Sequence, residues 1–134
     1  MALDYNCSLD TNAILRIALN DVPKQAKKVN ALLSDETQNF YVCDLVIAEV
    51  IFNLKNQALS RSEISSFLKF FFSLPNVHPE SSFVLDILDF YVEHPSLSFV
   101  DCYSAAFAEV NKKEPLLTFD KKLAKKHPSA KLIE

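Results

Sequence analysis

Short apolar runs alternate along the chain with longer stretches in which apolar residues recur every three or four positions. The short runs predict β-strands, and the longer stretches predict amphipathic helices. Strands are predicted at residues 6–9, 40–43, 115–119 and 131–134, with a weaker fifth at 76–78. Helices are predicted at 26–35, 45–57, 62–74, 81–94 and 99–113.

This alternation predicts an α/β fold, because parallel strands need crossover helices that pack on the faces of the sheet. We expect a three-layer α/β/α sandwich with a central, mostly parallel sheet of about four to five strands. The 134 residues have the size of one ordinary domain, and no repeat or linker divides them. A single domain over residues 1–134 is therefore predicted.

The apolar runs also bear on location. None is long enough to cross a bilayer. The first ten residues lack the basic start and apolar core of a secretory signal. We expect a cytoplasmic protein without a membrane partner.

Composition removes several kinds of site. The chain contains no glycine, so it has neither a glycine-rich phosphate loop nor a dinucleotide-binding turn. Its three cysteines are widely separated, which argues against a disulfide framework and against a zinc knuckle. His78, His94 and His127 each precede a proline in a turn-like segment, and we expect all three at the surface.

Charge is distributed unevenly along the chain. The net charge is -3, yet residues 101–134 hold 7 basic and 5 acidic side chains, against 7 and 12 in residues 1–100. The local basic excess suits contact with phosphate, although a lysine-rich helix is often only a solvated face. The candidate phosphate contacts near the end of the chain are Lys121, Lys122, Lys125 and Lys126.

Four acidic residues are candidates for chemistry. Asp10 and Asp120 each follow a predicted strand directly, Asp101 lies in the first turn of a predicted helix, and Glu49 interrupts a very apolar helix. Ligands gather beyond the carboxyl ends of parallel strands, so the four carboxylates are expected at one rim of the sheet.

Each acid also has a structural explanation. The three aspartates could cap helices, and Glu49 could be a helix acid paired with a lysine. Four carboxylates at one rim would repel one another, however, and a divalent cation would offset that repulsion. A set of oxygen ligands suits magnesium or manganese better than zinc. The face shared by Val46, Val50 and Leu54 predicts that Glu49 is partly buried.

Four segments together carry a resemblance to a known family. LDTN at 9–12, AEV at 48–50, VDCYSAAFA at 100–108 and LLTFDKKLAKK at 116–126 resemble the PIN-domain ribonucleases, particularly VapC-type toxins of toxin–antitoxin pairs. The chain departs from the family where it has Lys113, Glu114 and Pro115 in place of a common glycine.

The resemblance implies a fold, a set of ligands and an activity. It implies that one or two Mg²⁺ or Mn²⁺ ions bind to Asp10, Glu49, Asp101 and Asp120. Thr11 or Asn12, together with Thr118, would position these carboxylates. The implied activity is a divalent-metal-dependent endoribonuclease, the toxin of a type II pair, that leaves 5'-phosphate and 3'-hydroxyl ends.

The implied partners are RNA, a cognate antitoxin and a second copy of the chain. The helix at 62–74 supports an interface, because no single stripe can bury all four of its phenylalanines. We expect a homodimer on this ground.

Three alternatives stay open. A PIN fold can bind RNA or protein without cutting. A phosphatase of the haloacid dehalogenase type also begins with an acidic strand end, but it needs a second aspartate where this chain has Asn12. A receiver domain needs a phosphoacceptor at the end of a middle strand, where no candidate stands.

Overall fold

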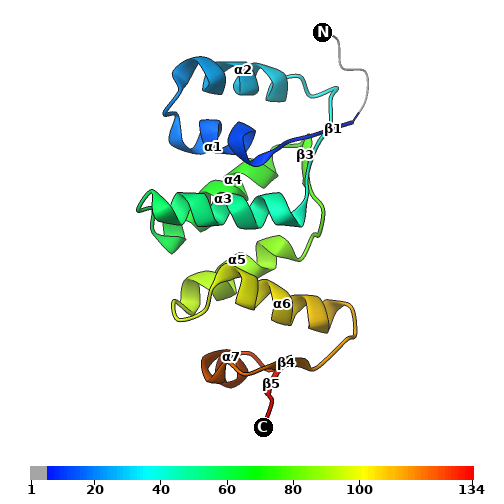
Figure 1. The fold of residues 1–134 in the computed structure, drawn as a ribbon. Helices are drawn as coiled ribbons and strands as arrows, with labels where there is room; N and C mark the ends of the chain where they lie inside the picture. Colours follow the sequence, from blue (N-terminus) through cyan, green and yellow to red (C-terminus); the bar gives the residue numbers. More distant parts are fainter. Residues whose placement is uncertain (1–5) are drawn as a thin grey trace. The chain divides into compact units, whose positions relative to one another are not determined.

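The computed structural model describes residues 6–134 and divides the chain into two compact units, residues 1–81 and 82–134 (Figure 1). Both units contain helices and parallel strands, which confirms the predicted α/β class. The expectation about a secretory signal rests partly on residues 1–5, which lie outside the described residues. In residues 6–134, no helix has the length and apolar character needed to span a bilayer.

Unit 1 contains a three-stranded parallel sheet. Strands β1 (Cys7–Ser8), β2 (Phe40–Val42) and β3 (Val77–Pro79) lie in the order β1-β2-β3. Phe40 aligns with Cys7 on one side and with Val77 on the other. The helices of this unit are α1 (Thr11–Leu19), α2 (Pro23–Leu33), α3 (Asp44–Asn56) and α4 (Arg61–Ser73).

The core of unit 1 follows from the period of each element. In β2, Phe40 and Val42 are buried while Tyr41 between them faces outward, as a pleated strand requires. Helix α4 buries Phe71 fully and Phe72 almost fully, and Phe67 is half-buried. Phe70 is 62% exposed and is the one exposed phenylalanine of this helix.

Unit 2 contains α5 (Val84–Glu93), α6 (Phe99–Val110), β4 (Leu116–Thr118), α7 (Lys121–Lys126) and β5 (Ala130–Leu132). Strands β4 and β5 pair in parallel. Helix α5 packs on α6, and both α6 and α7 contact β4. Leu88, Leu97 and Ala105 are fully buried in its core.

The structure differs from the sequence prediction in two details of the elements. The five predicted strands are present, and in residues 6–134 they pair as a three-stranded and a two-stranded sheet instead of one hydrogen-bonded sheet. Helix α1 was not predicted, because it begins two residues after the predicted strand 6–9 ends, and its apolar residues follow that strand without a longer polar turn.

Three turns place a residue other than glycine in the left-handed region. Asn20, Ala58 and Lys112 have φ values of 48°, 64° and 55°. Lys112 lies just before the segment where the chain departs from the PIN-family pattern. The chain therefore makes a left-handed turn there without the glycine that such a conformation favours.

Candidate functional site

Asp10 links the first strand of unit 1 to its first helix. It is exposed and serves as the N-cap of α1, where its Oδ1 accepts a hydrogen bond of 3.0 Å from the backbone N–H of Ala13. Asn12 is also exposed, whereas Thr11 is buried. An N-cap aspartate binds one of the N–H groups that the first turn leaves without a partner, which fixes the direction of its carboxylate.

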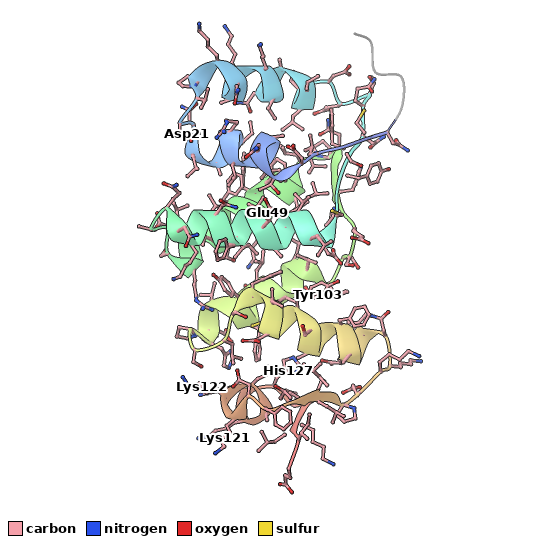
Figure 2. All side chains as sticks on the ribbon, viewed as in Figure 1. Asp21, Glu49, Tyr103, Lys121, Lys122 and His127 are labelled. Carbon is pink, nitrogen blue, oxygen red and sulfur yellow. The ribbon has the colours of Figure 1, made fainter. Side chains whose placement is uncertain are left out.

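Glu49 lies in the second turn of α3 and is exposed, which corrects the prediction that it is partly buried (Figure 2). The buried side of α3 consists of Ile47, Val50, Ile51 and Leu54. At 100° per residue, position 49 falls on the opposite side, together with the exposed Leu45 and Phe52. Because α1 packs on α3, Asp10 and Glu49 belong to contacting helices of one unit.

Asp101 lies in the first turn of α6 and takes part in a capping box. Its Oδ2 accepts a hydrogen bond of 3.0 Å from the N–H of Ser98, and its own N–H donates to Ser98 Oγ at 3.1 Å. The carboxylate is half-buried. The small residues Ala105 and Ala108 are buried one and two turns further on.

Asp120 repeats the arrangement of Asp10 in unit 2. It follows β4 and caps α7, where its Oδ1 accepts hydrogen bonds from the N–H groups of Lys122 at 2.9 Å and Leu123 at 3.1 Å. The backbone N–H of Asp120 donates to Thr118 Oγ1 at 2.9 Å. Thr118 therefore holds the backbone of Asp120, a contact that suits the positioning role implied by the resemblance.

These hydrogen bonds show that the aspartates can both cap helices and bind a metal ion. Asp10, Asp101 and Asp120 each bind backbone N–H groups through a single carboxylate oxygen. Within residues 6–134, the second oxygen of each accepts no hydrogen bond. A carboxylate can thus cap a helix with one oxygen and offer the other to a hard cation, and this donor set fits Mg²⁺ or Mn²⁺.

The four candidate acids divide equally between the units: Asp10 and Glu49 lie in unit 1, Asp101 and Asp120 in unit 2. Within the described part of each unit, no three side chains of His, Cys, Asp or Glu gather into a metal-binding group.

The four predicted phosphate-contacting lysines lie on one short helix. Lys121, Lys122, Lys125 and Lys126 all belong to α7 and are all exposed. Figure 2 shows Lys121 and Lys122 projecting from this helix. Asp120 caps the same helix, so all four lysines lie within two helical turns of this candidate metal-binding residue.

His127 is buried, which corrects the prediction that all three histidines lie at the surface. It ends α7, its ring lies 5.0 Å from that of Phe90, and its Nδ1 accepts a hydrogen bond from the N–H of Ser129. Burial lowers the pKa of His127 below its ordinary value, while Glu109 and Glu114 oppose that change. His78 and His94 are each half-buried.

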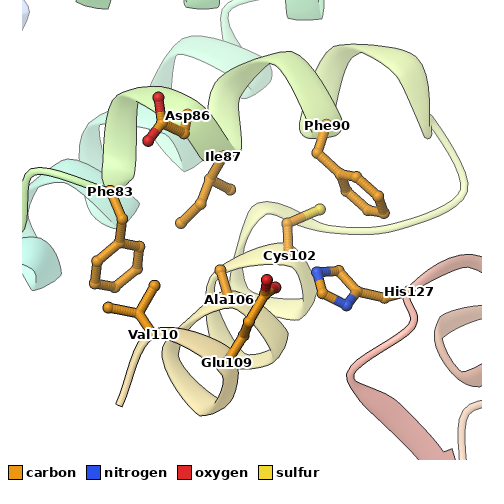
Figure 3. Close-up of a pocket in the computed structure, with 9 residues that line it drawn as sticks. All are labelled: Phe83, Asp86, Ile87, Phe90, Cys102, Ala106, Glu109, Val110 and His127. Atoms are coloured by element: carbon orange, nitrogen blue, oxygen red, sulfur yellow. The ribbon is translucent and has the colours of Figure 1, made fainter. Parts of the chain in front are cut away.

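The ring of His127 lines a pocket of about 240 Å³ in unit 2 (Figure 3). Ile87 and Phe90 of α5, together with Phe83 just before that helix, line one side, and Cys102, Ala106 and Glu109 of α6 line another. The sequence prediction missed this pocket, because the proline after His127 suggested an exposed turn.

The parallel α/β fold, with an aspartate two residues after the end of β1 and another two residues after the end of β4, has the features of a protein that binds a ligand beyond its strand ends. Residues 8–127 match the family model of the PIN domain. The chain therefore belongs to the PIN domain family, a family of metal-dependent nucleases that generally use divalent metals.

No curated protein matches the chain. The crystal structure of PAE2754 from Pyrobaculum aerophilum is similar, with 23% sequence identity and a TM-score of 0.35. The similarity covers 98% of this chain and 85% of that one.

Proposed function

We propose that the protein is a divalent-metal-dependent endoribonuclease and the toxin of a toxin–antitoxin pair. The observation that carries the proposal is the hydrogen bonding of Asp10, Asp101 and Asp120, each of which caps a helix through one oxygen only. The match to the PIN family spans all four candidate acids. The phosphatase and receiver alternatives gain no support from that match.

The acids and lysines have separate tasks in this proposal. Asp10, Glu49, Asp101 and Asp120 hold one or two ions of Mg²⁺ or Mn²⁺. A bound ion of this kind lowers the pKa of a water molecule and stabilises the leaving oxygen in phosphodiester hydrolysis. Thr118 fixes the backbone of Asp120, and the lysines of α7 attract the RNA phosphates.

The partners follow from the same assignment. A homodimer would cover Phe70, the one phenylalanine that α4 leaves exposed. An antitoxin would block access to the acids. Sedimentation at high protein concentration tests for the homodimer, and a monomer under these conditions would contradict it.

The deciding experiment measures cleavage of an end-labelled structured RNA with Mn²⁺, with Mg²⁺ and with a chelator. The variants are Asp10→Asn, Asp101→Asn and Asp120→Asn. At positions 10 and 120 asparagine caps a helix about as well as aspartate, and at position 101 its amide oxygen can still accept from the N–H of Ser98. These changes therefore remove a metal-binding charge and keep the hydrogen bonds at the helix starts. We expect each variant to lose at least about 100-fold in rate, since even the outer-shell partners of metal ligands cost about 10–100-fold.

Glu63→Gln is the matched control. Glu63 occupies the same capping-box position in α4 that Asp101 occupies in α6, and it is not a candidate ligand. Full activity of Glu63→Gln together with inactive aspartate variants would establish the nuclease. Equal cleavage by all proteins would point to a contaminant, and no cleavage by folded, metal-bound wild type would favour a PIN module that only binds.

The toxin role needs its own measurement. Expression of the wild type should arrest growth, and expression of Asp101→Asn to the same level should not. Co-expression with the product of an adjacent small gene should restore growth and yield a stable complex. Growth arrest by both proteins would contradict a toxicity that depends on RNA cleavage.

A further inference from the structure

A second pocket lies in unit 1, between α1 and α2. It has a volume of about 230 Å³ and is lined by Asn12, Ala13 and Arg16 of α1 and by Gln25, Lys28 and Val29 of α2. Its accessible lining is almost entirely apolar, and its two apolar residues are Ala13 and Val29. It is smaller than the roughly 300–1,000 Å³ of a pocket for a drug-sized ligand. The occupant is therefore small, with an apolar face.

Two polar side chains that line this pocket, Arg16 and Gln25, are hydrogen-bonded to each other. Arg16 donates through Nε to Gln25 Oε1 at 2.7 Å and forms an ion pair with Asp21 at 3.1 Å. A guanidinium group has no acceptor, so the atom of Gln25 that faces Arg16 is the oxygen. The NH₂ group of Gln25 thereby becomes a donor of fixed direction. Asn12, which is exposed, adds a second amide with both a donor and an acceptor.

The charge around the pocket favours an anion. Residues 11–33 hold four basic side chains, Arg16, Lys24, Lys27 and Lys28, against the single acid Asp21. Residues 1–81 as a whole hold 7 basic and 9 acidic side chains, so this excess is local. All three lysines are exposed on α2. An anion with a flat apolar part and a polar edge has the chemistry of a nucleotide.

The pocket also adjoins a candidate metal ligand. The backbone N–H of Ala13 donates to Asp10 Oδ1, and the side chain of Ala13 lines the pocket. Asn12 lies two residues after Asp10. Two of the residues that line the pocket, Asn12 and Ala13, therefore lie in the helical turn that Asp10 caps.

We propose that this pocket binds one unpaired nucleotide of the RNA substrate, next to the phosphodiester bond that is cut. The base lies on Ala13 and Val29, and Lys28 binds its phosphate. The inference rests on the proposed nuclease function and adds to it a position at which the enzyme selects its substrate.

The test measures binding of a single-stranded oligoribonucleotide in the presence of a chelator, so that no cleavage occurs. Lys28→Gln removes the charge that lines the pocket, and Lys27→Gln removes an equally exposed charge that does not line it. We expect Lys28→Gln to weaken binding about tenfold and to lower the salt dependence by about one phosphate contact. Lys27→Gln should have a much smaller effect on both. Equal effects of the two variants would overturn the proposal in favour of a diffuse basic surface.

A second variant tests the base rather than the phosphate. Val29→Phe fills the apolar part of the pocket and leaves every charge in place. It should weaken binding of an intact oligonucleotide about tenfold, should not weaken binding of the same oligonucleotide made abasic, and should leave the salt dependence unchanged. Circular dichroism checks that the variant folds. Equal binding of both oligonucleotides by the folded variant and the wild type would overturn the base pocket.

These measurements separate the two proposals. If Lys28→Gln and Val29→Phe weaken binding but the wild type never cleaves RNA, the pocket stands and the nuclease proposal fails. If the wild type cleaves RNA and neither variant changes binding or the cleavage pattern, the nuclease stands and the pocket is overturned.

Discussion

Units 1 and 2 place an aspartate in the same local setting but support it differently. Asp10 caps the nine-residue helix α1, which buries Ile14 and Leu15. Asp120 caps the six-residue helix α7, which buries only Leu123, and accepts two N–H bonds where Asp10 accepts one. Packing therefore holds α1, whereas α7 depends more on its cap, because so short a helix has little intrinsic stability.

The interiors of the two units differ in chemistry as well. The buried polar residues of unit 1 include Asn76, whose Nδ2 donates to the backbone oxygens of Leu33 and Asp35. In unit 2 the buried polar residues are His127 and Ser129. An amide keeps its charge state at every pH, while an imidazole titrates near neutrality. Unit 2 should consequently be the more sensitive of the two to pH.

The largest predicted effect concerns whether the two units unfold together. Phe71→Ala removes a fully buried ring from unit 1, and Leu88→Ala removes a fully buried side chain from unit 2. The first should lower the free energy of unfolding by about 3–5 kcal/mol and the second by about 2–5 kcal/mol. If the chain is the single domain that its length predicts, either variant should shift one shared transition in urea.

Residue-resolved hydrogen exchange measures the protection of backbone amides in each unit separately. In a single domain, slowly exchanging amides of both units should lose protection in both variants. Loss of protection in unit 1 alone after Phe71→Ala would instead show that the units unfold independently.

Much of this architecture could be predicted from the pattern of apolar residues, and the exceptions have physical causes. The strand at 40–43 and the helix at 45–57 were placed to within a residue, because their apolar residues follow the periods of 2 and 3.6. Helix α1 was missed, because the chain passes from β1 to the helix through Asp10 without a longer turn. On α3 the predicted buried face of Val46, Val50 and Leu54 was right for Val50 and Leu54, but the observed face is rotated toward Ile47 and Ile51, which leaves Glu49 on the exposed side.

The candidate site could be predicted in its residue types and their positions after strands, since carboxylates at strand ends are visible in the sequence. The hydrogen bonds that orient them could not, because they depend on backbone conformation at each cap. Charge counted over residues 1–100 concealed the basic excess of α2. The pocket between α1 and α2 also depends on how two helices pack, which no local pattern specifies.

The second predicted effect is a loss of stability in acid that arises in unit 2. Burial lowers the pKa of His127 below its ordinary value of 6.5. The charges of Glu109 and Glu114 raise this pKa, and His94 lowers it. The unfolded chain then binds a proton more readily than the folded chain. The stabilising effect of neutral His127 is complete above about pH 6.5 and is lost as the pH falls toward the lowered pKa.

Urea unfolding at pH 8 and pH 5.5 measures this effect. His127→Gln should show a smaller difference between the two pH values than the wild type. His78→Gln removes an imidazole from unit 1 and leaves His127 in place, so the difference caused by His127 should persist in it. An identical pH dependence in the wild type and His127→Gln would show that the interior of unit 2 is not the source.

The smallest predicted effect concerns the turn before β4. Lys112 has a φ of 55°, where a residue with a Cβ carries a penalty of about 1–2 kcal/mol. Lys112→Gly removes that penalty, but glycine also gains entropy in the unfolded chain, so the net stabilisation should be no more than about 1 kcal/mol. Lys113→Gly is the control, since Lys113 does not have a positive φ and its replacement should bring only the entropic loss. Chemical denaturation of both variants measures the difference, and a Lys112→Gly protein no more stable than Lys113→Gly would show that the left-handed turn carries no strain. Ala58→Gly makes the same change in unit 1, where Ala58 has a φ of 64°, and should likewise stabilise the protein by no more than about 1 kcal/mol.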